Sequence, residues 1–282
     1  MRHIMERIHI QRVLNYIEEH LKEELDNTML AQIAGYSEFH FLRIFKKNIG
    51  LTPADYIRKR RISEIVCRIA DERPISEIAF EYGFNSKENF TRAFKKEHNI
   101  LPTEFKAVNC SLRLFQPYSF DTAEPLPTVY MRYLESFTLV AYPFDDEELP
   151  PNCWNKYNAE KRSLRLSGSE ETEDFGAMIR DPEKERLRYY IGVRSEAARG
   201  DISNTVRLDI AGGLYAVFET PPVTQHEFVA TIRRTWDWIY REWLPNSGKV
   251  RANGFELESY VESSREYTER IYIPLGNGAE NG

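Results

Sequence analysis

Two short basic segments of this chain carry side chains suited to neutralising phosphate groups. Residues 43–61 hold seven lysines and arginines against one aspartate, and residues 87–96 hold four against one glutamate. An arginine guanidinium can bind guanine or phosphate through two parallel hydrogen bonds, whereas a lysine ammonium approaches phosphate as a point charge. The two segments therefore predict contact with a polyanion such as double-stranded DNA.

The charge of the whole chain argues in the other direction. The 282 residues include 38 Lys and Arg against 44 Asp and Glu, a formal net charge of −6. Residues 1–110 hold 18 basic against 16 acidic side chains, whereas residues 111–282 hold 20 against 28. The acidic excess therefore belongs to the second part of the chain, which predicts two domains with different partners.

The basic segments lie within two copies of one sequence unit, residues 30–57 and 78–106. Each copy predicts a short helix, a glycine-containing turn and a second helix opened by serine. That is the helix-turn-helix pattern, whose second helix enters the major groove. One copy alone is equally typical of an amphipathic helix with a solvated basic face, but two matched copies favour DNA binding. The matched pairs are Ala31 and Ala79, Gly35 and Gly83, Ser37 and Ser86, Phe41 and Phe90, Arg43 and Arg92, Phe45 and Phe94, and Pro53 and Pro102.

The elements that position these residues are predicted from helical periodicity and from the places of Gly and Pro. They indicate helices over 8–25, 29–34, 37–48 and 53–72. A helix over 53–72 would be about 30 Å long. Successive major grooves on one side of a duplex lie about 34 Å apart, so one chain could occupy two of them without dimerising.

The second helix of each copy is predicted to have an apolar inward face and a polar outward face. The inward residues are Phe41, Ile44, Phe45, Phe90, Ala93 and Phe94. On the outward face, Phe39 and Leu42 can meet thymine methyl groups, although either can instead belong to the core. His40 is better suited to the helix surface than to base contact. The residues predicted to contact DNA are Ser37, Phe39, His40, Leu42, Arg43, Lys46, Lys47, Arg61, Lys87, Glu88, Asn89, Thr91, Arg92, Lys95 and Lys96.

Residues 7–106 resemble the DNA-binding module of AraC-type transcription regulators, in particular the branch of multidrug and oxidative-stress activators. The motifs are GYSEFHFLRIFKKNIGLTPADYIRKRRISEI and ISEIAFEYGFNSKENFTRAFKKEHNILPTEF. The resemblance implies binding to two major grooves and contact with RNA polymerase. It supports Phe39, Leu42 and Arg43 in one recognition helix and Lys87, Glu88, Asn89 and Arg92 in the other. The chain departs from the family at Phe105-Lys106, where Tyr-Arg is usual.

The chain changes character after residue 110. Residues 111–126 are predicted to be a linker, and residues 127–282 a second domain. We therefore expect a multidomain protein: an all-α tandem helix-turn-helix domain over 1–110, then an α+β domain of duplicated strand-helix-strand-strand units. The predicted strands lie within 128–143, 187–193, 214–219, 255–261 and 270–274, and the predicted helices within 152–165 and 224–243.

The predicted strand FELESY, residues 255–260, carries the candidate ligand-binding chemistry of the second domain. Strand alternation places Glu256, Glu258 and Tyr260 on one face. Carboxylates among aromatic rings make a site for hydrophobic cations. A half-solvated strand with exposed glutamates explains the same pattern, so both interpretations stay open.

The run YREWLPNSG, together with FELESY, IYIPL, AGGLYAVFETPP and YYIGV, resembles the GyrI-like effector-binding domain over residues 127–275. The resemblance implies a ligand groove containing Glu258 and Tyr260, with Glu256 as the rival carboxylate. Trp154 and Tyr190 are expected to form groove walls, whereas Trp243 is expected in the core.

Nothing in the chain predicts a metal, a cofactor or a catalytic centre. The six histidines have no metal-ligand spacing, and neither a P-loop nor a nucleophile elbow is present. We therefore expect a bacterial transcription regulator, not an enzyme, that binds DNA and a small hydrophobic or cationic effector as a monomer or dimer. A GyrI-like hydrolase and a protein-interaction module, for example one that binds gyrase, are the alternatives. Three scattered cysteines and the lack of a secretory signal or membrane span predict the cytoplasm.

Overall fold

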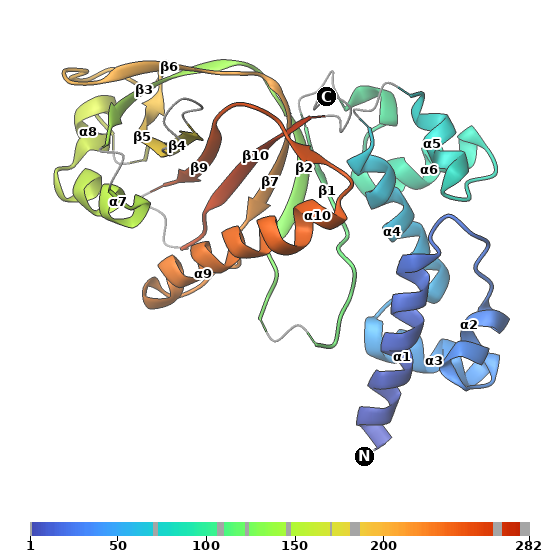
Figure 1. The fold of residues 1–282 in the computed structure, drawn as a ribbon. Helices are drawn as coiled ribbons and strands as arrows, with labels where there is room; N and C mark the ends of the chain where they lie inside the picture. The colour runs from blue at the N-terminus through green and yellow to red at the C-terminus, as the bar shows by residue number, and fades with distance from the viewer. Residues whose placement is uncertain are drawn as a thin grey trace. The chain divides into compact units, whose positions relative to one another are not determined.

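The computed structural model describes residues 2–69, 73–105, 110–121, 124–144, 148–169, 171–180, 187–261 and 267–276. The chain forms two compact units, shown in Figure 1. The helical unit contains residues 1–108 and 112–125, and the sheet unit contains residues 109–111 and 126–282. Each unit is described by itself.

The helical unit contains the predicted pair of helix-turn-helix units. Its elements are α1 (Arg2–Glu19), α2 (Asn27–Ala34), α3 (Glu38–Ile49), α4 (Pro53–Cys67), α5 (Ile75–Glu81), α6 (Lys87–His98) and the 3₁₀ turn η1 (Pro102–Glu104). Two helices differ most from their predicted bounds, and α1 begins at Arg2, before the predicted start at residue 8. Helix α1 ends at Glu19, before the predicted end at residue 25. Helix α4 has 15 residues, about 22 Å, because it ends at Cys67; residues 70–72 of the predicted helix lie outside the described residues.

Local capping explains where these helices begin and end. The side chains of Asp26, Thr52 and Ser86 each accept a hydrogen bond from a backbone N–H in the first turn of α2, α4 and α6. Ser37 occupies the equivalent position before α3, but its side chain makes no such bond. Gly35 ends α2 with a φ of 70°, a left-handed conformation that glycine adopts without strain.

The segment that follows the helices packs back onto them. The Phe115 N–H donates to Ser63 Oγ at 2.7 Å, and the Phe115 carbonyl accepts from the Arg60 guanidinium at 2.6 Å. The N–H of Tyr118 donates to the Tyr56 hydroxyl at 3.1 Å. Much of the segment proposed as a linker, residues 111–126, is therefore hydrogen-bonded to α4.

The sheet unit is an antiparallel sheet with helices, as predicted. Its strands run in the order β2-β7-β10-β9-β4-β5-β3-β6, with β8 paired to β10. The order is symmetric about the β9–β4 pair, since β3, β4 and β5 on one side correspond to β7, β9 and β10 on the other. The strands of the chain are β1 (Ser111–Arg113), β2 (Thr128–Leu134), β3 (Phe137–Pro143), β4 (Asp174–Arg180), β5 (Leu187–Arg194), β6 (Val206–Ile210), β7 (Gly213–Glu219), β8 (Val250–Arg251), β9 (Glu256–Tyr260) and β10 (Arg270–Gly276).

The helices of this unit complete its two strand-helix-strand-strand halves. They are α7 (Pro150–Ala159), α8 (Arg162–Ser167), α9 (Gln225–Trp238), the π-helical turn η2 (Ile239–Trp243) and α10 (Leu244–Asn246). The helix predicted over 152–165 is divided between α7 and α8, because Lys161 adopts a left-handed φ of 51° between them. In Figure 1, α9 runs along the sheet below β7 and β10, and α7 and α8 lie beside β4 and β5.

Strand alternation separates the side chains of the sheet into two apolar clusters. One cluster contains Tyr189, Ile191 and Val193 of β5 with Tyr157 of α7, so it lies on the face that the helices cover. The opposite cluster contains Phe175, Leu257 and Tyr272, with Tyr190 and Phe255 packed against it. Trp243 is buried against Phe218, with ring centroids 4.8 Å apart, which confirms its predicted place in the core.

Candidate DNA-recognition helices and effector pocket

The first recognition helix, α3, has the two faces that the sequence predicts. Phe41, Ile44 and Phe45 are buried. On the other face Arg43 is exposed, and Phe39 is 81% exposed. This exposure excludes the core alternative for Phe39 and leaves its ring accessible to a binding partner.

The remaining residues of α3 that were predicted to contact DNA differ in their exposure and in their side-chain partners. Lys46 is exposed, and Leu42 and His40 are half-buried. His40 packs edge-on against Tyr36 and lies 3.2 Å from an Arg43 guanidinium nitrogen. Lys47 forms a 3.1 Å ion pair with the nearly buried Glu6. The Lys47 ammonium is thus already paired with a carboxylate of α1 in the structure.

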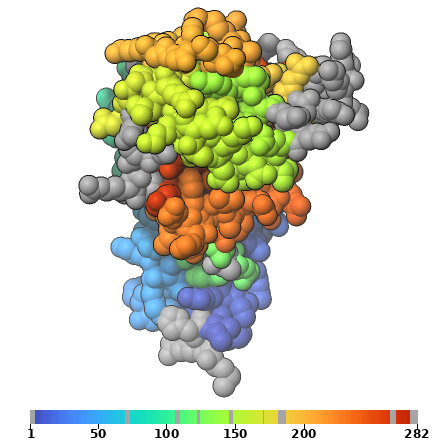
Figure 2. Space-filling view, turned by 90° about the vertical axis from the view of Figure 1, so that its left-hand side faces the viewer, coloured from blue at the N-terminus to red at the C-terminus, as the bar shows by residue number. Residues whose placement is uncertain are grey.

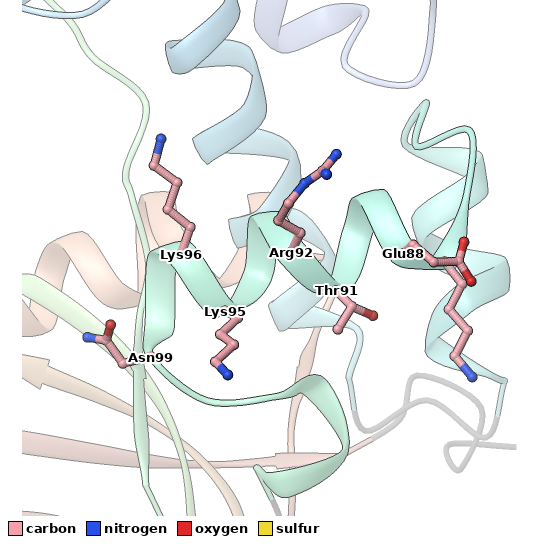
Figure 3. Close-up of a pocket in the computed structure, with 7 residues that line it drawn as sticks. Glu88, Thr91, Arg92, Lys95, Lys96 and Asn99 are labelled. Atoms are coloured by element: carbon pink, nitrogen blue, oxygen red, sulfur yellow. The ribbon is translucent and has the colours of Figure 1, made fainter.

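The second recognition helix, α6, presents polar side chains over several turns. Phe90 and Phe94 are buried, whereas Lys87, Glu88, Arg92, Lys95 and Lys96 are exposed and Asn89 and Thr91 half-buried. Figure 3 shows the labelled side chains projecting from α6 around an open hollow, which Asn99 also lines. The Arg92 guanidinium donates to the side-chain amide oxygen of Asn89, Oδ1, at 2.5 Å, so the two side chains are pre-arranged as one polar group.

Arg61 does not fit its predicted role as a DNA contact. Its guanidinium donates to the Leu21 carbonyl at 2.8 Å and to the Glu23 carbonyl at 2.6 Å. The guanidinium also lies against Gly83, at the turn before α6. Arg61 therefore satisfies the carbonyls that follow α1 and joins this end of α1 to α4, which leaves few of its donors for phosphate.

The sheet unit contains a cavity of about 610 Å³ between α7, α9 and the central strands. This is the volume of a site for a drug-sized molecule. Its lining is mostly apolar and aromatic. The residues that line it are Leu149, Pro150, Pro151, Trp154, Asn155, Asn158, Met178, Gln225, Phe228, Val229, Ile232, Arg233, Trp236, Asp237, Glu258, Tyr260, Tyr267 and Glu269. Figure 2 looks onto this side of the unit, where red surface of the C-terminal strands shows between yellow-green α7 and orange α9.

Glu258 is the polar centre of this cavity. It is 4% exposed, and its carboxylate accepts three hydrogen bonds from aromatic side chains. The donors are Tyr189 Oη at 2.6 Å, Trp236 Nε1 at 2.7 Å and Trp154 Nε1 at 3.3 Å. Burial raises the pKa of Glu258, and the three donors act in the opposite direction by stabilising the carboxylate.

Tyr189, not the predicted Tyr190, is the tyrosine of β5 that reaches the cavity residues. Tyr190 lies on the opposite face of the sheet, where its ring contacts Phe255. Consecutive side chains on a strand alternate between faces, so an error of one residue reverses the assignment. The Tyr-Tyr pair in the sequence fits either register, and only the pairing of β5 with β4 decides between them.

Gly176 makes the approach of the donors to Glu258 possible. It lies opposite Glu258 in the β4–β9 register. A Cβ atom at this position would overlap the Tyr189 hydroxyl and lie 3.2 Å from Trp154 Cζ2. No sequence pattern singled out this glycine, because its role depends on two side chains that are distant in the chain.

Glu256 lies on the same face of β9 but has different partners. Its carboxylate accepts hydrogen bonds from the Arg251 guanidinium and the Tyr240 hydroxyl. It is buried and does not line the cavity. Of the two glutamates that the sequence left in competition, Glu258 is therefore the one available to a ligand.

Glu269 is a second carboxyl group in the cavity that the sequence analysis missed. It is 4% exposed, and its Oε1 atom has no hydrogen-bond partner within the described part of the chain. Burial, and then the charge of Glu258, raise the pKa of Glu269 well above its usual range. It precedes β10 outside any alternating pattern, so no periodicity pointed to it.

Aromatic rings form the walls around these carboxyl groups. Tyr260 packs against Phe228 with centroids 5.5 Å apart, and Phe228 packs against Tyr267 at 5.7 Å. Trp154 meets Tyr260 edge to face at 6.3 Å. Trp154 and Tyr260 thus lie where the sequence placed them, whereas Phe228 and Tyr267 were not predicted. Within the described residues, no cluster of His, Cys, Asp or Glu is arranged to hold a metal ion, and no helix is long and apolar enough to cross a membrane.

Both units match known families. Residues 30–107 match the model of a helix-turn-helix domain, and residues 131–275 match that of the integron-associated effector binding protein. The transcriptional regulator Rob of Salmonella typhimurium is 28% identical over 272 residues, which cover 90% of each chain. The multiple antibiotic resistance protein MarA of the same species is 34% identical over 103 residues, 36% of this chain and 81% of MarA.

Two further similarities are more limited. The uncharacterised regulator YbfP of Bacillus subtilis is 39% identical over 99 residues, which are 34% of this chain and 33% of YbfP. The solved structure of SAV2435 bound to tetraphenylphosphonium covers 52% of this chain and 93% of its own, at 16% identity and a TM-score of 0.42.

Proposed function

The chain belongs to the AraC-type regulators with a C-terminal integron-associated, GyrI-like effector-binding domain, and we propose that its effector is a hydrophobic cation bound beside Glu258. It is a DNA-binding transcription regulator. The proposal concerns the chemistry of the effector and the way in which the two recognition helices meet DNA.

The buried carboxylate of Glu258 is the observation that supports a cationic effector. An ionised carboxylate in an apolar cavity is costly unless a positive charge or hydrogen bonds compensate it. The Tyr189, Trp236 and Trp154 donors stabilise the ionised form of Glu258 against the cost of burial and leave the carboxylate facing the cavity. Aromatic faces add attraction for a cation in the same space. A hydrophobic cation fits these features better than an anion, which Glu258 would repel.

The two recognition helices support contact with two major grooves by one chain. Each exposes an arginine that can bind guanine, Arg43 on α3 and Arg92 on α6. Each also exposes lysines suited to phosphate, Lys46 on α3 and Lys95 and Lys96 on α6. A groove-binding helix needs both kinds of contact, because phosphate contacts set its position and base contacts set its sequence preference.

The effector proposal is tested with two ions of nearly the same shape and opposite charge. We expect tetraphenylphosphonium to raise the melting temperature of the full-length chain and tetraphenylborate to leave it unchanged, since only the cation pairs with Glu258. Calorimetric titration of the same ions gives the affinities.

The matched variants are Glu258→Gln and Glu256→Gln. We expect Glu258→Gln to lose roughly tenfold or more of its affinity for the cation, because the charge facing the cavity is gone. Glu256→Gln should retain wild-type affinity, since Glu256 pairs with Arg251 outside the cavity. Equal binding of the borate, or equal loss in both variants, would contradict the proposal.

A further inference from the structure

The cavity contains two carboxyl groups in unequal surroundings. Glu258 accepts three hydrogen bonds, whereas Glu269 Oε1 is buried without a hydrogen-bond partner in the part of the chain that the structure describes. Both residues line the same cavity and each is 4% exposed. One carboxyl group is thus stabilised as an anion by three donors, and the other has an oxygen that the described residues leave without a hydrogen bond.

The β9–β10 register fixes how these two groups lie. Ile271 pairs with Glu258, and Arg270 pairs with Ser259. Glu269, one residue earlier, is therefore a diagonal neighbour of Glu258 on the same face of the sheet. Diagonal neighbours on adjacent antiparallel strands have Cα atoms about 7–8 Å apart. The two carboxyl groups are close enough to repel as anions and far enough apart to bind separate groups of one ligand.

The described residues that line the cavity offer little positive charge to offset two anions. Helix α7 contributes Trp154, Asn155 and Asn158 to the cavity, and β4 contributes Met178, all without charge. Helix α9 contributes Arg233 and Asp237, which carry opposite charges at its exposed rim. Tyr260 of β9 and Tyr267, before β10, are the other titratable side chains that line it.

The ionisation of the pair follows from these surroundings. Two buried carboxylates at this separation do not both ionise while the cavity is empty of cations. The hydrogen bonds favour ionised Glu258, and burial with the neighbouring charge of Glu258 raises the pKa of Glu269 well above its usual range. The hydrogen bonds thus favour the charge of the pair on Glu258, and burial beside that charge favours the proton on Glu269.

We propose that Glu269 is a second acidic subsite, through which the cavity selects hydrophobic ligands that carry two cationic groups. The proposal rests on the proposed function, since the first cationic group pairs with Glu258. When the second cationic group reaches Glu269, the carboxyl group releases its proton to solvent and pairs as a carboxylate. A monocation leaves that proton in place, because one positive charge already balances Glu258.

The test compares a dication with a monocation of the same shape. The dication is 1,4-bis(trimethylammoniomethyl)benzene, and the monocation replaces one trimethylammonium group by a tert-butyl group of the same shape. Titration calorimetry of the full-length chain in two buffers of different ionisation enthalpy counts the protons released. We expect the dication to release about one proton more than the monocation, and its affinity to rise with pH by up to about tenfold per unit until Glu269 ionises unaided.

Glu269→Gln is the matched variant. We expect it to bind the monocation within about twofold of wild type, to lose roughly tenfold or more of its dication affinity, and to release no additional proton. Monocation binding by the variant shows that the cavity is intact. Equal proton release by both ligands in the wild-type chain overturns the second subsite while leaving the proposed function standing. Failure of the wild-type chain to bind either ligand overturns both.

Discussion

The properties of Glu258 depend on a few contacts, and two of these contacts require a glycine at position 176. The Tyr189 hydroxyl and the Trp154 and Trp236 indoles all converge on one carboxylate. Two of these rings pass directly over Gly176, where a side chain would occupy the same space. The proposed effector site therefore depends on the absence of a Cβ atom at Gly176.

We predict that Gly176→Ala weakens cation binding and destabilises the sheet unit by about 1–3 kcal/mol, because the new methyl group displaces Tyr189 or Trp154 from Glu258. Urea denaturation and titration with tetraphenylphosphonium measure the two effects. Gly168→Ala is the control for the titration alone: its left-handed φ of 76° strains the alanine and lowers stability, but an added Cβ meets no atom within 4 Å and the residue does not line the cavity. Unchanged cation affinity in Gly176→Ala would show that the three donors do not depend on this glycine.

Helix α4 organises the helical unit at the scale of elements. The Tyr56 hydroxyl donates to Glu18 of α1 at 2.8 Å and accepts from the Tyr118 N–H of the following segment. The Tyr56 ring packs edge to face on Phe45 of α3 and on Phe115. A single buried side chain thus connects α1, the first recognition helix and the segment that leads towards the sheet unit in sequence.

We predict that Tyr56→Phe destabilises the helical unit by about 1–2 kcal/mol, because it removes two hydrogen bonds at a buried position and leaves the ring packing intact. Thermal and urea unfolding of the full-length chain, followed by helical circular dichroism, measure the change. Tyr118→Phe is the control, since that ring is 38% exposed. Equal stability of both variants would show that the segment 112–125 is only loosely held by α4.

At the scale of the whole molecule, the position of the charged side chains matters more for DNA binding than the net charge. The formal net charge is −6, yet exposed lysines and arginines lie on α3 and α6. Association with DNA depends on the charges that approach the phosphates within a screening length of about 8–10 Å, not on the sum over the chain. A net negative protein can therefore bind DNA with an affinity that falls steeply as salt rises.

We predict that Lys46→Gln and Lys95→Gln each reduce the slope of log affinity against log salt by about 0.9, and together by about 1.8, because each removes one phosphate contact. The measurement uses full-length chain and a duplex that it selects from random sequence. Lys156→Gln with Lys161→Gln changes the net charge equally in the sheet unit and should leave the slope unchanged. If Lys95→Gln alone has the same salt slope as the wild-type chain, then Lys95 of α6 does not contact phosphate, which contradicts the proposed role of α6.

The sequence by itself determined the elements and the faces that local rules control. Repeated glycines, serines and arginines predicted both helix-turn-helix units, since the residues that cap a helix and turn the chain act on their immediate neighbours. Alternation in FELESY placed Glu256, Glu258 and Tyr260 on one face, because every second side chain of a strand points to the same face of the sheet. Resemblance of the motifs then indicated both families, and the choice between Glu256 and Glu258 stayed open.

Only the tertiary structure decided which side chains share the cavity. Strand register assigned Tyr189 in place of Tyr190, and the space left by Gly176 lets the Tyr189 phenol and the Trp154 indole reach Glu258. Arg61 became a contact within the helical unit because the carbonyls after α1 lie beside it. Glu269 lines the cavity although no periodic pattern in the sequence indicated it. Each outcome depends on residues that are far apart in the chain. Local spacing cannot predict such contacts, because it describes only the neighbours of a residue in the sequence.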